Sequence, residues 1–215
     1  MTDRTQLTDP VWEYAEAHST PHSNYLHHVE RRTHLTTLAP QMLSGRMQGR
    51  LLSMYSKMMR PRLVVEVGTF TAYATLCLAE GLAPEGRIIT IEAEEERERM
   101  ARDHIEGSAY ADRIELRMGD AVELLPDVPD GIDIAFLDGN KRQYGQYFDL
   151  LIDKVRPGGL LLADNVLWDG RVADTSRKDK DADLMRAFNA KVRDDERVEQ
   201  LILPLRDGLT MMVKR

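Results

Sequence analysis

The 215-residue sequence has one cysteine, few aromatic residues and no long hydrophobic run. Cys77 has no partner for an internal disulfide bond, so packing must hold the fold together. A chain of this length can bury about 70% of its unfolded surface in a single domain. The opening MTDRTQLTD is polar, and no apolar segment is long enough for a membrane span. We therefore expect one cytoplasmic domain over residues 1–215, with no membrane contact.

An excess of positive charge is also absent. Acidic side chains number 36 and basic ones 29, which gives a net charge of -7. This charge repels phosphate backbones and argues against a broad nucleic-acid surface. A local basic patch stays open as an alternative, and Arg31, Arg32, Arg46 and Arg50 are its candidates. The sequence has no internal repeat and no low-complexity segment.

Strand-length apolar runs alternate with helix-length segments from Leu63 onward. The five runs are Leu63–Val67, Ile88–Ile91, Ile114–Met118, Ile132–Leu137 and Gly159–Ala163. This alternation predicts a doubly wound parallel sheet. The tail VEQLILPLRDGLTMMVK adds two apolar strands around Asp207-Gly208, which is a hairpin signal. The sequence therefore predicts an α/β fold with a mostly parallel seven-stranded sheet and a C-terminal antiparallel hairpin.

Residues 1–60 contain no convincing strand. Apolar residues such as Leu51, Leu52 and Tyr55 recur at helical spacing, so we predict a helical N-terminal cap on a core formed by residues 61–215. Five of the six histidines fall in this cap. Neighbours such as His27 and His28 point to different sides of a helix, which favours solvated or capping histidines over a zinc site.

Two of the predicted strands end in acidic residues. Asp138 follows Ile132–Leu137, and Asp164 with Asn165 follows Gly159–Ala163. A right-handed crossover makes these strands parallel, so their carboxyl ends lie at one edge of the sheet. Two carboxylates and an amide are hard oxygen ligands that suit Mg²⁺, Mn²⁺ or Ca²⁺. The alternative is that these residues only stop strands and cap helices.

The ends of the other strands suggest an adenosine-containing cofactor. The first strand ends in Glu66-Val67-Gly68, and Glu92 at the next strand end can accept hydrogen bonds from both ribose hydroxyls. Gly119-Asp120 is placed to flank a base. The sequence lacks the G-x-G-x-x-G of dinucleotide binders and the G-K-[ST] of a phosphate loop. An adenosine ligand without phosphates points to S-adenosylmethionine.

The segments EVGTFTAY, TIEAE, FLDGNK and ADNVLWDG occur in this order. With this spacing the chain, from about Met42 to its end, resembles the cation-dependent O-methyltransferases related to catechol and caffeoyl-coenzyme A O-methyltransferases. The resemblance implies a Rossmann-like class I methyltransferase fold, S-adenosylmethionine as cofactor, a divalent cation and a homodimer.

The resemblance also implies a role for each matching residue. Asp138, Asp164 and Asn165 would hold the cation, and Lys141 would be the catalytic base beside Asp138. Met42 and Ser44 would cover the site from the N-terminal side, and Trp168 would form part of the substrate wall. The residues expected around the cofactor are Ser44, Glu66, Gly68, Thr69, Tyr73, Ala74, Glu92, Asp120, Ala121 and Asp138.

Two positions depart from the family pattern. The family usually has Gly-Tyr-Ser where this chain has Ala72-Tyr73-Ala74, so a serine hydroxyl expected near the cofactor carboxylate is missing. Thr75 or a backbone amide is the candidate substitute. Asn140 stands where plant relatives often carry a second acid.

The expected reaction is methyl transfer to one hydroxyl of a vicinal diol, such as a catechol, chelated to the cation. Lys141 would take the hydroxyl proton, because a nearby cation and partial burial favour a neutral amine. One alternative is a tRNA hydroxyuridine O-methyltransferase of the same family. Another, from a different class, is a non-catalytic adenosine-binding module.

Overall fold

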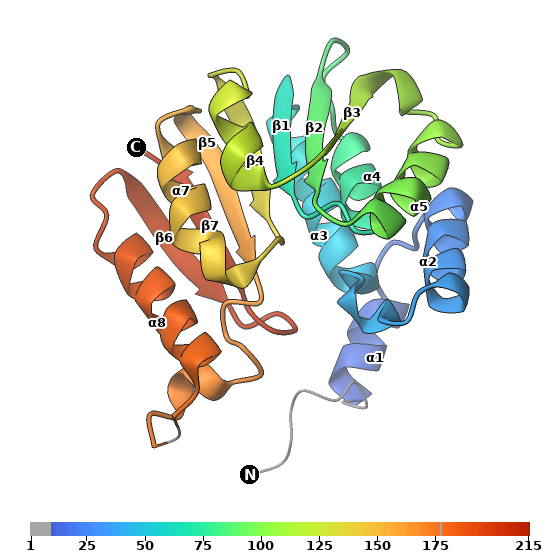
Figure 1. The fold of residues 1–215 in the computed structure, drawn as a ribbon. Coiled ribbons are helices and arrows are strands. Elements are labelled where there is room, and N and C mark those ends of the chain that lie inside the picture. Colours follow the sequence, from blue (N-terminus) through green and yellow to red (C-terminus); the bar gives the residue numbers. More distant parts are fainter. Residues whose placement is uncertain (1–9, 177) are drawn as a thin grey trace.

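The computed structural model describes residues 10–176 and 178–215, which fold around one seven-stranded sheet (Figure 1). The strand order is β3-β2-β1-β4-β5-β7-β6. β1 to β5 pair in parallel, and β7 pairs antiparallel with both β5 and β6. The strands are β1 (Leu63–Val67), β2 (Arg87–Glu92), β3 (Ile114–Met118), β4 (Ile132–Leu137), β5 (Val155–Asp164), β6 (Val198–Leu203) and β7 (Leu209–Lys214).

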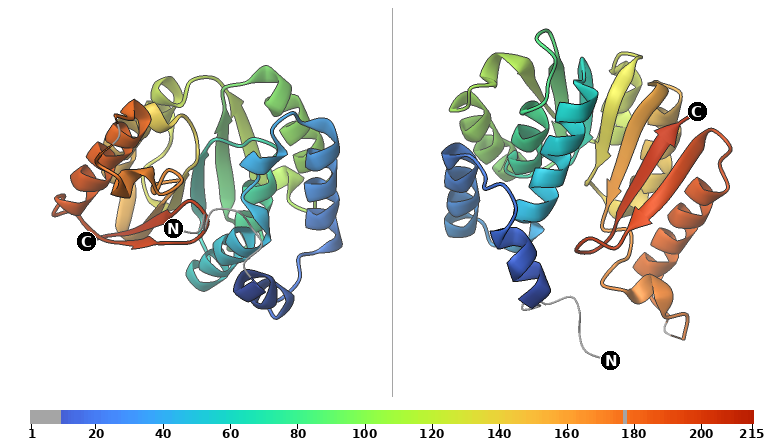
Figure 2. Two further views of the ribbon diagram at one scale, coloured as in Figure 1. Left: turned by 90° about the horizontal axis from the view of Figure 1, so that it is seen from below. Right: turned by 180° about the vertical axis from the view of Figure 1, so that it is seen from behind.

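Helices cover both faces of the sheet, as the alternating pattern predicted. α3, α4 and α5 pack on one face, and α6, α7 and α8 pack on the other (Figures 1 and 2). α1 and α2 belong to the N-terminal cap. The helices are α1 (Pro10–Ala17), α2 (Asn24–Thr36), α3 (Gly45–Met59), α4 (Tyr73–Ala79), α5 (Glu95–Glu106), α6 (Ala121–Leu124), α7 (Tyr144–Ile152) and α8 (Lys180–Arg193).

Short 3-10 turns complete the connections between these elements. They are η1 (Pro40–Met42), η2 (Ala111–Arg113), η3 (Leu125–Asp127), η4 (Lys141–Gln143) and η5 (Arg171–Ala173). None of the helices in the described part of the chain has the length and apolar character needed to cross a membrane.

The predicted fold class is confirmed, and three predicted strands have the observed bounds: β1, β3 and β4. β1 and β4 are buried along their whole length, as expected for central parallel strands with both faces covered. β5 begins earlier than predicted, at Val155 instead of Gly159. The sequence pattern did not predict the first part of β5, because Pro157 and Gly158 are residues that normally mark the end of a strand.

The topological switch point lies between β1 and β4. The chain crosses from β1 to β2 on one side and returns to β4 on the other, so the loops after β1 and β4 diverge. In open α/β sheets, ligands bind in the crevice beyond the carboxyl ends of the strands at such a point. That edge is the lower one in Figure 1 and faces the viewer in the left panel of Figure 2.

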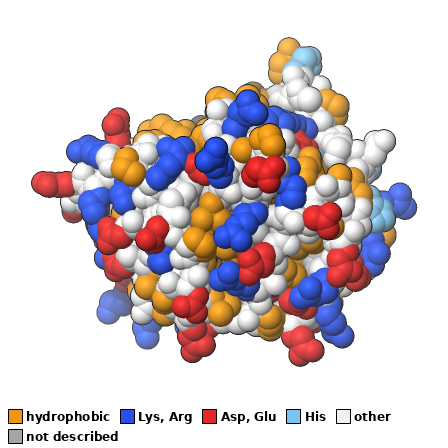
Figure 3. Space-filling view, turned by 90° about the horizontal axis from the view of Figure 1, so that it is seen from above, with side chains coloured by type: hydrophobic (Ala, Val, Ile, Leu, Met, Phe, Trp, Pro, Cys, Tyr) orange, Lys and Arg blue, Asp and Glu red, His pale blue; other side chains and the backbone are white. Residues whose placement is uncertain are grey.

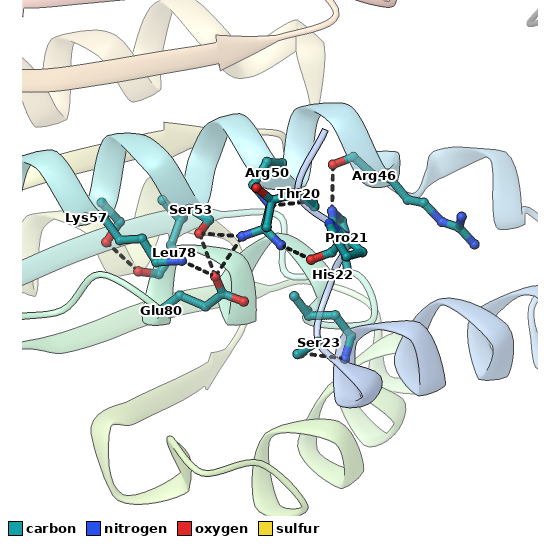
Figure 4. A network of polar contacts seen from close by, with 12 residues as sticks. Thr20, Pro21, His22, Ser23, Arg46, Arg50, Ser53, Lys57, Leu78 and Glu80 are labelled. Carbon is teal, nitrogen blue, oxygen red and sulfur yellow. Dashed lines mark hydrogen bonds and ion pairs between the residues drawn. The ribbon is translucent and has the colours of Figure 1, made fainter. Parts of the chain in front are cut away.

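A polar network fastens the N-terminal cap to the core (Figure 4). Arg50 on α3 donates to the carbonyl oxygens of Thr20 and Pro21 and pairs with Glu80 at 3.3 Å. Glu80 also accepts from Ser53 and Lys57. The segment before α2 is therefore tied to α3, and α3 to the end of α4.

The end of the molecule opposite the switch point carries charges of both signs. Basic and acidic side chains are interspersed on the surface seen from above (Figure 3). On this face a continuous basic surface is absent from the described residues, as expected from the negative net charge.

Asp133 joins β1, β4 and β5 at the start of the parallel strands. Its Oδ2 accepts from the backbone N–H groups of Arg62 and Leu63 at 2.7 and 3.0 Å, and its Oδ1 accepts from Arg156 Nε at 2.5 Å. Burial opposes ionisation, but the Arg156 and backbone hydrogen bonds outweigh it and lower the pKa of Asp133 below 3.8.

We expect Asp133→Ala to lower the free energy of unfolding by about 2–3 kcal/mol at pH 7, because it leaves charged and backbone donors unpaired. The pKa of Asp133 is lower in the folded protein than in the unfolded chain. The stabilisation by the ionised carboxylate is therefore present above pH 3.8 and is lost as the pH falls through the pKa of the folded protein. Urea unfolding at pH 7 and pH 3 measures both effects. Asp153→Ala, at an exposed ion pair with Arg197, is the control; equal losses in the two variants would contradict the prediction.

Candidate active site

The backbones of β1 and β4 come very close where the two strands end. Asp138 N donates to Val67 O at 2.8 Å, and Gly68 N donates to Ile91 O at 2.9 Å. Gly68 has a φ of +95°, and a Cβ there would lie 2.4 Å from the carbonyl oxygen of Asp138. Glycine is therefore required at position 68 by the neighbouring strand, in addition to the close ligand approach that the sequence suggested.

Glu66 is fully buried in a network of threonine hydroxyls. Its Oε2 accepts from Thr75 and, at 2.6 Å, from Thr90, whose hydroxyl lies 2.6 Å from that of Thr69. Burial raises the pKa of Glu66 to about 8. Its Oε1 is buried with no hydrogen-bond partner in the structure. A buried carboxyl oxygen of this kind is available to a polar group on a bound ligand.

The turn from β1 into α4 has an unusual backbone. Phe70 and Ala72 both have positive φ values, +52° and +65°, in the left-handed region. The family's usual glycine at position 72 is explained by this conformation, which an alanine adopts only with strain. Thr75 donates to Glu66, so its hydroxyl is already engaged and is a poor replacement for the missing serine at Ala74.

Two buried residues support this turn from below. His104 Nδ1 lies 2.9 Å from Thr71 O, and the hydroxyls of Thr33 and Thr71 are 2.8 Å apart. Tyr73 is also buried, and its hydroxyl contacts His22 Nδ1 on the cap. The sequence patterns did not reveal the roles of Thr33, His22 and His104, because each acts on a distant segment.

Glu92 is buried and held by backbone donors. Its Oε2 accepts from Phe70 N at 2.7 Å, and its Oε1 accepts from the N–H groups of Ala93 and Glu94, each at 3.0 Å. Three fixed donors hold the carboxylate in one orientation at the end of β2, where the ribose-binding role was predicted. The same bonds tie the turn after β1 to β2.

Asp120 caps α6 at the end of β3. Its Oδ1 accepts from Val122 N at 2.8 Å, and Gln143 Nε2 lies 3.2 Å from its Oδ2. Ala121 is buried beneath it. The predicted adenine-flanking pair therefore lies at the same sheet edge as Glu92, beside the turn that carries Lys141.

Lys141 and Asp138 form an ion pair, with Nζ 2.6 Å from Oδ1 and both side chains about one-fifth exposed. Burial raises the pKa of Asp138 to about 6, an effect that Lys141 opposes and Asp164 reinforces. Asn140 accepts from Arg142 N at 3.2 Å and so caps the turn that carries Lys141. This capping contact gives Asn140 a structural role at the position where the family pattern left its role open.

Asp164 is buried, and both of its carboxylate oxygens have donors. Gln48 Nε2 donates to Oδ2 at 2.7 Å, and the backbone N–H of Asn165 donates to Oδ1 at 2.8 Å. The β4–β5 register pairs Leu137 with Ala163, so Asp138 and Asp164 occupy equivalent positions one residue further on. The expected convergence of the two acids is therefore present.

Tyr144 joins the same two strand ends from below. Its buried hydroxyl lies within hydrogen-bond distance of the carbonyl oxygens of Leu137 and Asp164, at 2.9 and 3.0 Å, and shares its one hydrogen between them; Lys141 Nζ lies 5.1 Å from the centre of its ring. Sequence reasoning missed Tyr144 and Gln48, although each places a polar group on the buried face of its helix. That combination was the available signal.

The residues predicted to form the walls lie on two separate segments. Met42 is partly exposed at the end of η1, and Ser44 is buried just before α3. Trp168 is half-buried in the loop after β5, with a φ of +50° and an Nε1 that is buried without a partner. The cap and this loop therefore approach the strand ends from different sides.

A cleft of about 620 Å³ lies in the N-terminal cap, between α1 and α3. Its lining includes His22, Arg46 and Arg50 but none of the predicted site residues. Arg46 binds Glu30 and Glu16, and Arg50 binds Glu80, so acids neutralise these two members of the proposed basic patch. This pairing weakens the case for a nucleic-acid docking surface.

The strand-end residues fit a divalent cation in their donor chemistry. Asp138 and Asp164 supply carboxylates at adjacent strand ends, and the amide of Asn165 adds a further hard oxygen donor. Among the described residues, no three His, Cys, Asp or Glu side chains are grouped to hold a metal ion. The zinc alternative for the N-terminal histidines therefore has no support in this part of the chain.

Residues 16–215 match the family model described as O-methyltransferase. The chain belongs to the O-methyltransferase family. This confirms the family and the enzyme class predicted from the sequence. The enzyme is 34% identical to Tricin synthase 2 of Oryza sativa subsp. japonica over 76% of this chain, and it spans 60% of that protein. It is 31% identical to the catechol O-methyltransferase of Niastella koreensis, over 74% of this chain and 73% of that protein.

Solved structures extend the similarity to the whole fold. The O-methyltransferase from Bacillus cereus in complex with SAH is 29% identical, with a TM-score of 0.87 and coverage of 95% of this enzyme and 97% of that chain. The O-methyltransferase TomG from Streptomyces achromogenes in complex with SAM is 26% identical, with a TM-score of 0.86 and coverage of 97% and 99%.

We expect Glu66→Gln to change how the stability of the enzyme depends on pH. In the wild type the Glu66 carboxyl has an ordinary pKa of 4.5 in the unfolded chain and a pKa of about 8 in the folded protein. Between these two pH values it is ionised only in the unfolded chain, so the free energy of unfolding falls as the pH rises. The variant lacks this loss, and its advantage should grow by at most roughly 1.4 kcal/mol per pH unit.

Urea unfolding of the ligand-free protein at pH 5, 6.5 and 8 provides the measurement. Glu115→Gln, at a partly exposed acid on β3, is the control. Parallel pH profiles for Glu66→Gln and the wild type would show that Glu66 ionises normally.

Proposed function

We propose that this O-methyltransferase uses S-adenosylmethionine and a divalent cation to methylate one hydroxyl of a vicinal diol of the catechol type. The observation that carries the proposal is the cluster at the switch point. Asp138 and Asp164 lie at adjacent strand ends beside Asn165, and the Lys141 amine is 2.6 Å from Asp138. A base next to a set of hard oxygen ligands suits a reaction that removes a proton from a chelated hydroxyl.

The other strand ends suit the cofactor. Glu92 is held by three backbone donors in an orientation available to the ribose hydroxyls, and Asp120 with Ala121 would border the adenine. Gly68 and the unpartnered Glu66 Oε1 lie deeper, on the side assigned to the methionine part. The SAH and SAM complexes of the Bacillus and Streptomyces relatives support this choice of ligand.

A cation held by Asp138, Asp164 and Asn165 would supply a Lewis acid and a template for two adjacent substrate oxygens. The Lys141 amine lies 2.6 Å from Asp138 and would therefore be next to the chelated hydroxyl. Lys141 then accepts the hydroxyl proton. The substrate oxygen forms a bond to the methyl carbon, and the electrons of the C–S bond return to sulfur.

Two segments would select the substrate. Met42 and Ser44 lie on the cap side, and Trp168 lies on the loop after β5. An aromatic ring can stack on the partly exposed Trp168 indole, which favours catechols over aliphatic diols. The names of the Niastella catechol O-methyltransferase and of the caffeoyl-CoA O-methyltransferase from Mesembryanthemum crystallinum agree with this substrate class.

A homodimer is part of the proposal. In the described residues no helix covers the outer strands β6 and β7 on the face shown in the right panel of Figure 2. Leu201 and Val213 are exposed there, and Met54 and Met58 are exposed on the neighbouring α3. Apolar surface of this kind is typical of an interface, and a second copy is the proposed partner. A cytoplasmic location stays a prediction.

We expect Asp164→Ala to abolish methyl transfer in assays with and without chelator. The variant lacks one of the two carboxylates expected to hold the cation beside Asn165. Methyl transfer from labelled S-adenosylmethionine to a catechol provides the measurement, with Mg²⁺ added to metal-stripped buffer. Asp183→Ala, at an exposed acid on α8, is the control. Full activity of Asp164→Ala in metal-stripped buffer would rule out the cation mechanism.

We expect Lys141→Ala to lower kcat by about 10²–10⁴-fold while cofactor affinity changes little, because the amine acts on the substrate proton. Calorimetric titration with S-adenosylmethionine and single-turnover kinetics separate the two quantities. Lys191→Ala removes a half-exposed lysine of α8 that pairs with Asp149 and provides the control. Lost cofactor affinity with an unchanged rate would count against Lys141 as the base.

Binding and methyl-transfer assays with other substrates separate the alternative functions. Salt-sensitive tRNA binding with methylation of a hydroxylated uridine would favour the RNA substrate. Binding of S-adenosylmethionine without turnover of any vicinal diol would favour the non-catalytic module.

A further inference from the structure

The turn between β6 and β7 reaches the candidate active site from the C-terminal end of the chain. Gly208 N donates to Leu205 O at 2.9 Å and closes the turn, in which Arg206 and Gly208 have φ values of +52° and +89°. Both views in Figure 2 place this turn beside the start of α3 and the loop after β5. The sequence identified Asp207-Gly208 only as a hairpin signal.

Arg206 binds the N-terminal cap. Its Nη1 donates to the carbonyl oxygen of Ser44 and lies 3.4 Å from Gln48 Oε1. The other end of the buried Gln48 amide donates to Asp164 Oδ2 at 2.7 Å. A continuous polar path therefore runs from Arg206 through Gln48 to the carboxylate predicted to hold the cation.

Asp207 binds the loop after β5. Its carboxylate accepts from Asp169 N. Its carbonyl oxygen accepts from Leu167 N at 2.8 Å, and Gly208 O accepts from Val166 N at 3.2 Å. Val166, Leu167 and Asp169 are thus bound to this turn.

These contacts fix the orientation of the Gln48 amide. A guanidinium only donates hydrogen bonds, so Gln48 turns its oxygen to Arg206 and its NH₂ group to Asp164. Arg206 therefore orients the predicted ligand Asp164 from one side, and Asp207 holds the backbone of the loop that follows Asn165 on the other side.

We propose that Arg206 and Asp207 are positioning residues for cation binding: Arg206 orients Asp164 through Gln48, and Asp207 holds the loop that carries Asn165. The inference rests on the proposed function, in which Asp164 and Asn165 are ligands. Partners that orient metal ligands typically change metal affinity by about 10–100-fold when they are removed.

Mn²⁺ binding to the protein without cofactor or substrate tests the proposal, with free Mn²⁺ measured by electron paramagnetic resonance. Arg206→Met and Asp207→Ala should each weaken binding by about 10-fold or more. Arg206→Lys should restore part of the affinity, because it keeps a donor for Ser44. Melting temperatures show which variants stay folded, and Arg206→Lys provides the test if Arg206→Met does not fold.

Arg193 and Asp194 supply matched controls. They form an adjacent Arg-Asp pair at the end of α8 with both side chains about two-thirds exposed. Arg193→Met and Asp194→Ala should leave Mn²⁺ affinity unchanged. If the folded Arg206 and Asp207 variants bind Mn²⁺ within twofold of the wild type, the positioning role is wrong. If the wild type itself binds no Mn²⁺, the proposed function fails instead.

A double-mutant cycle tests the path through Gln48. Gln48→Leu removes the donor to Asp164, so adding Arg206→Met should weaken Mn²⁺ binding little further. If the double variant loses Mn²⁺ affinity by the product of the two single losses, Arg206 acts by a route that does not include Gln48. At saturating Mn²⁺, kcat of Arg206→Met should return to within about threefold of the wild type, because affinity and not chemistry is impaired. A kcat that stays low at every Mn²⁺ concentration would contradict a positioning role.

Discussion

The alignment of the strand ends at the switch point is the constraint on which the site depends. Asp138 N bonds Val67 O, and the missing Cβ of Gly68 lets the two backbones meet. The β4–β5 register then brings Asp164 level with Asp138. Asp138 and Asp164 would not be neighbours if either register slipped by one residue, because alternate side chains point to opposite faces of a sheet.

Hydrogen bonds from distant segments hold the polar groups of this edge in place. Glu92 is fixed by backbone donors, Asp164 by Gln48, and the ends of β4 and β5 by Tyr144. The loops that follow neighbouring parallel strands diverge at the switch point, so they do not hold one another in place. The precision of the site therefore comes from α3, α7 and the β6–β7 turn, which lie outside the motifs that identify the family.

Much of the architecture follows from local pattern. The bounds of β1, β3 and β4 agree with the apolar runs, because central parallel strands are continuously hydrophobic. The early part of β5 was missed, since Pro157 and Gly158 lie in a register irregularity between the paired residues Val155 and Leu160, which the sequence does not show. The placement of Asp138 beside Lys141 and Asp164 was predictable because the strand-to-loop transitions are sharp. The contacts of Gln48, Tyr144 and Arg206 were not, because each joins residues far apart in the chain.

The sequence by itself determined the fold class, the family and the edge of the sheet at which the chemistry is expected, because apolar periodicity and short motifs are local properties. Only the tertiary structure decided how the polar groups are used. It showed that position 72 is left-handed, that Thr75 is committed to Glu66, and that two of the four arginines of the basic patch are paired with acids. These outcomes depend on distances between separate segments, which are set by packing of the complete chain.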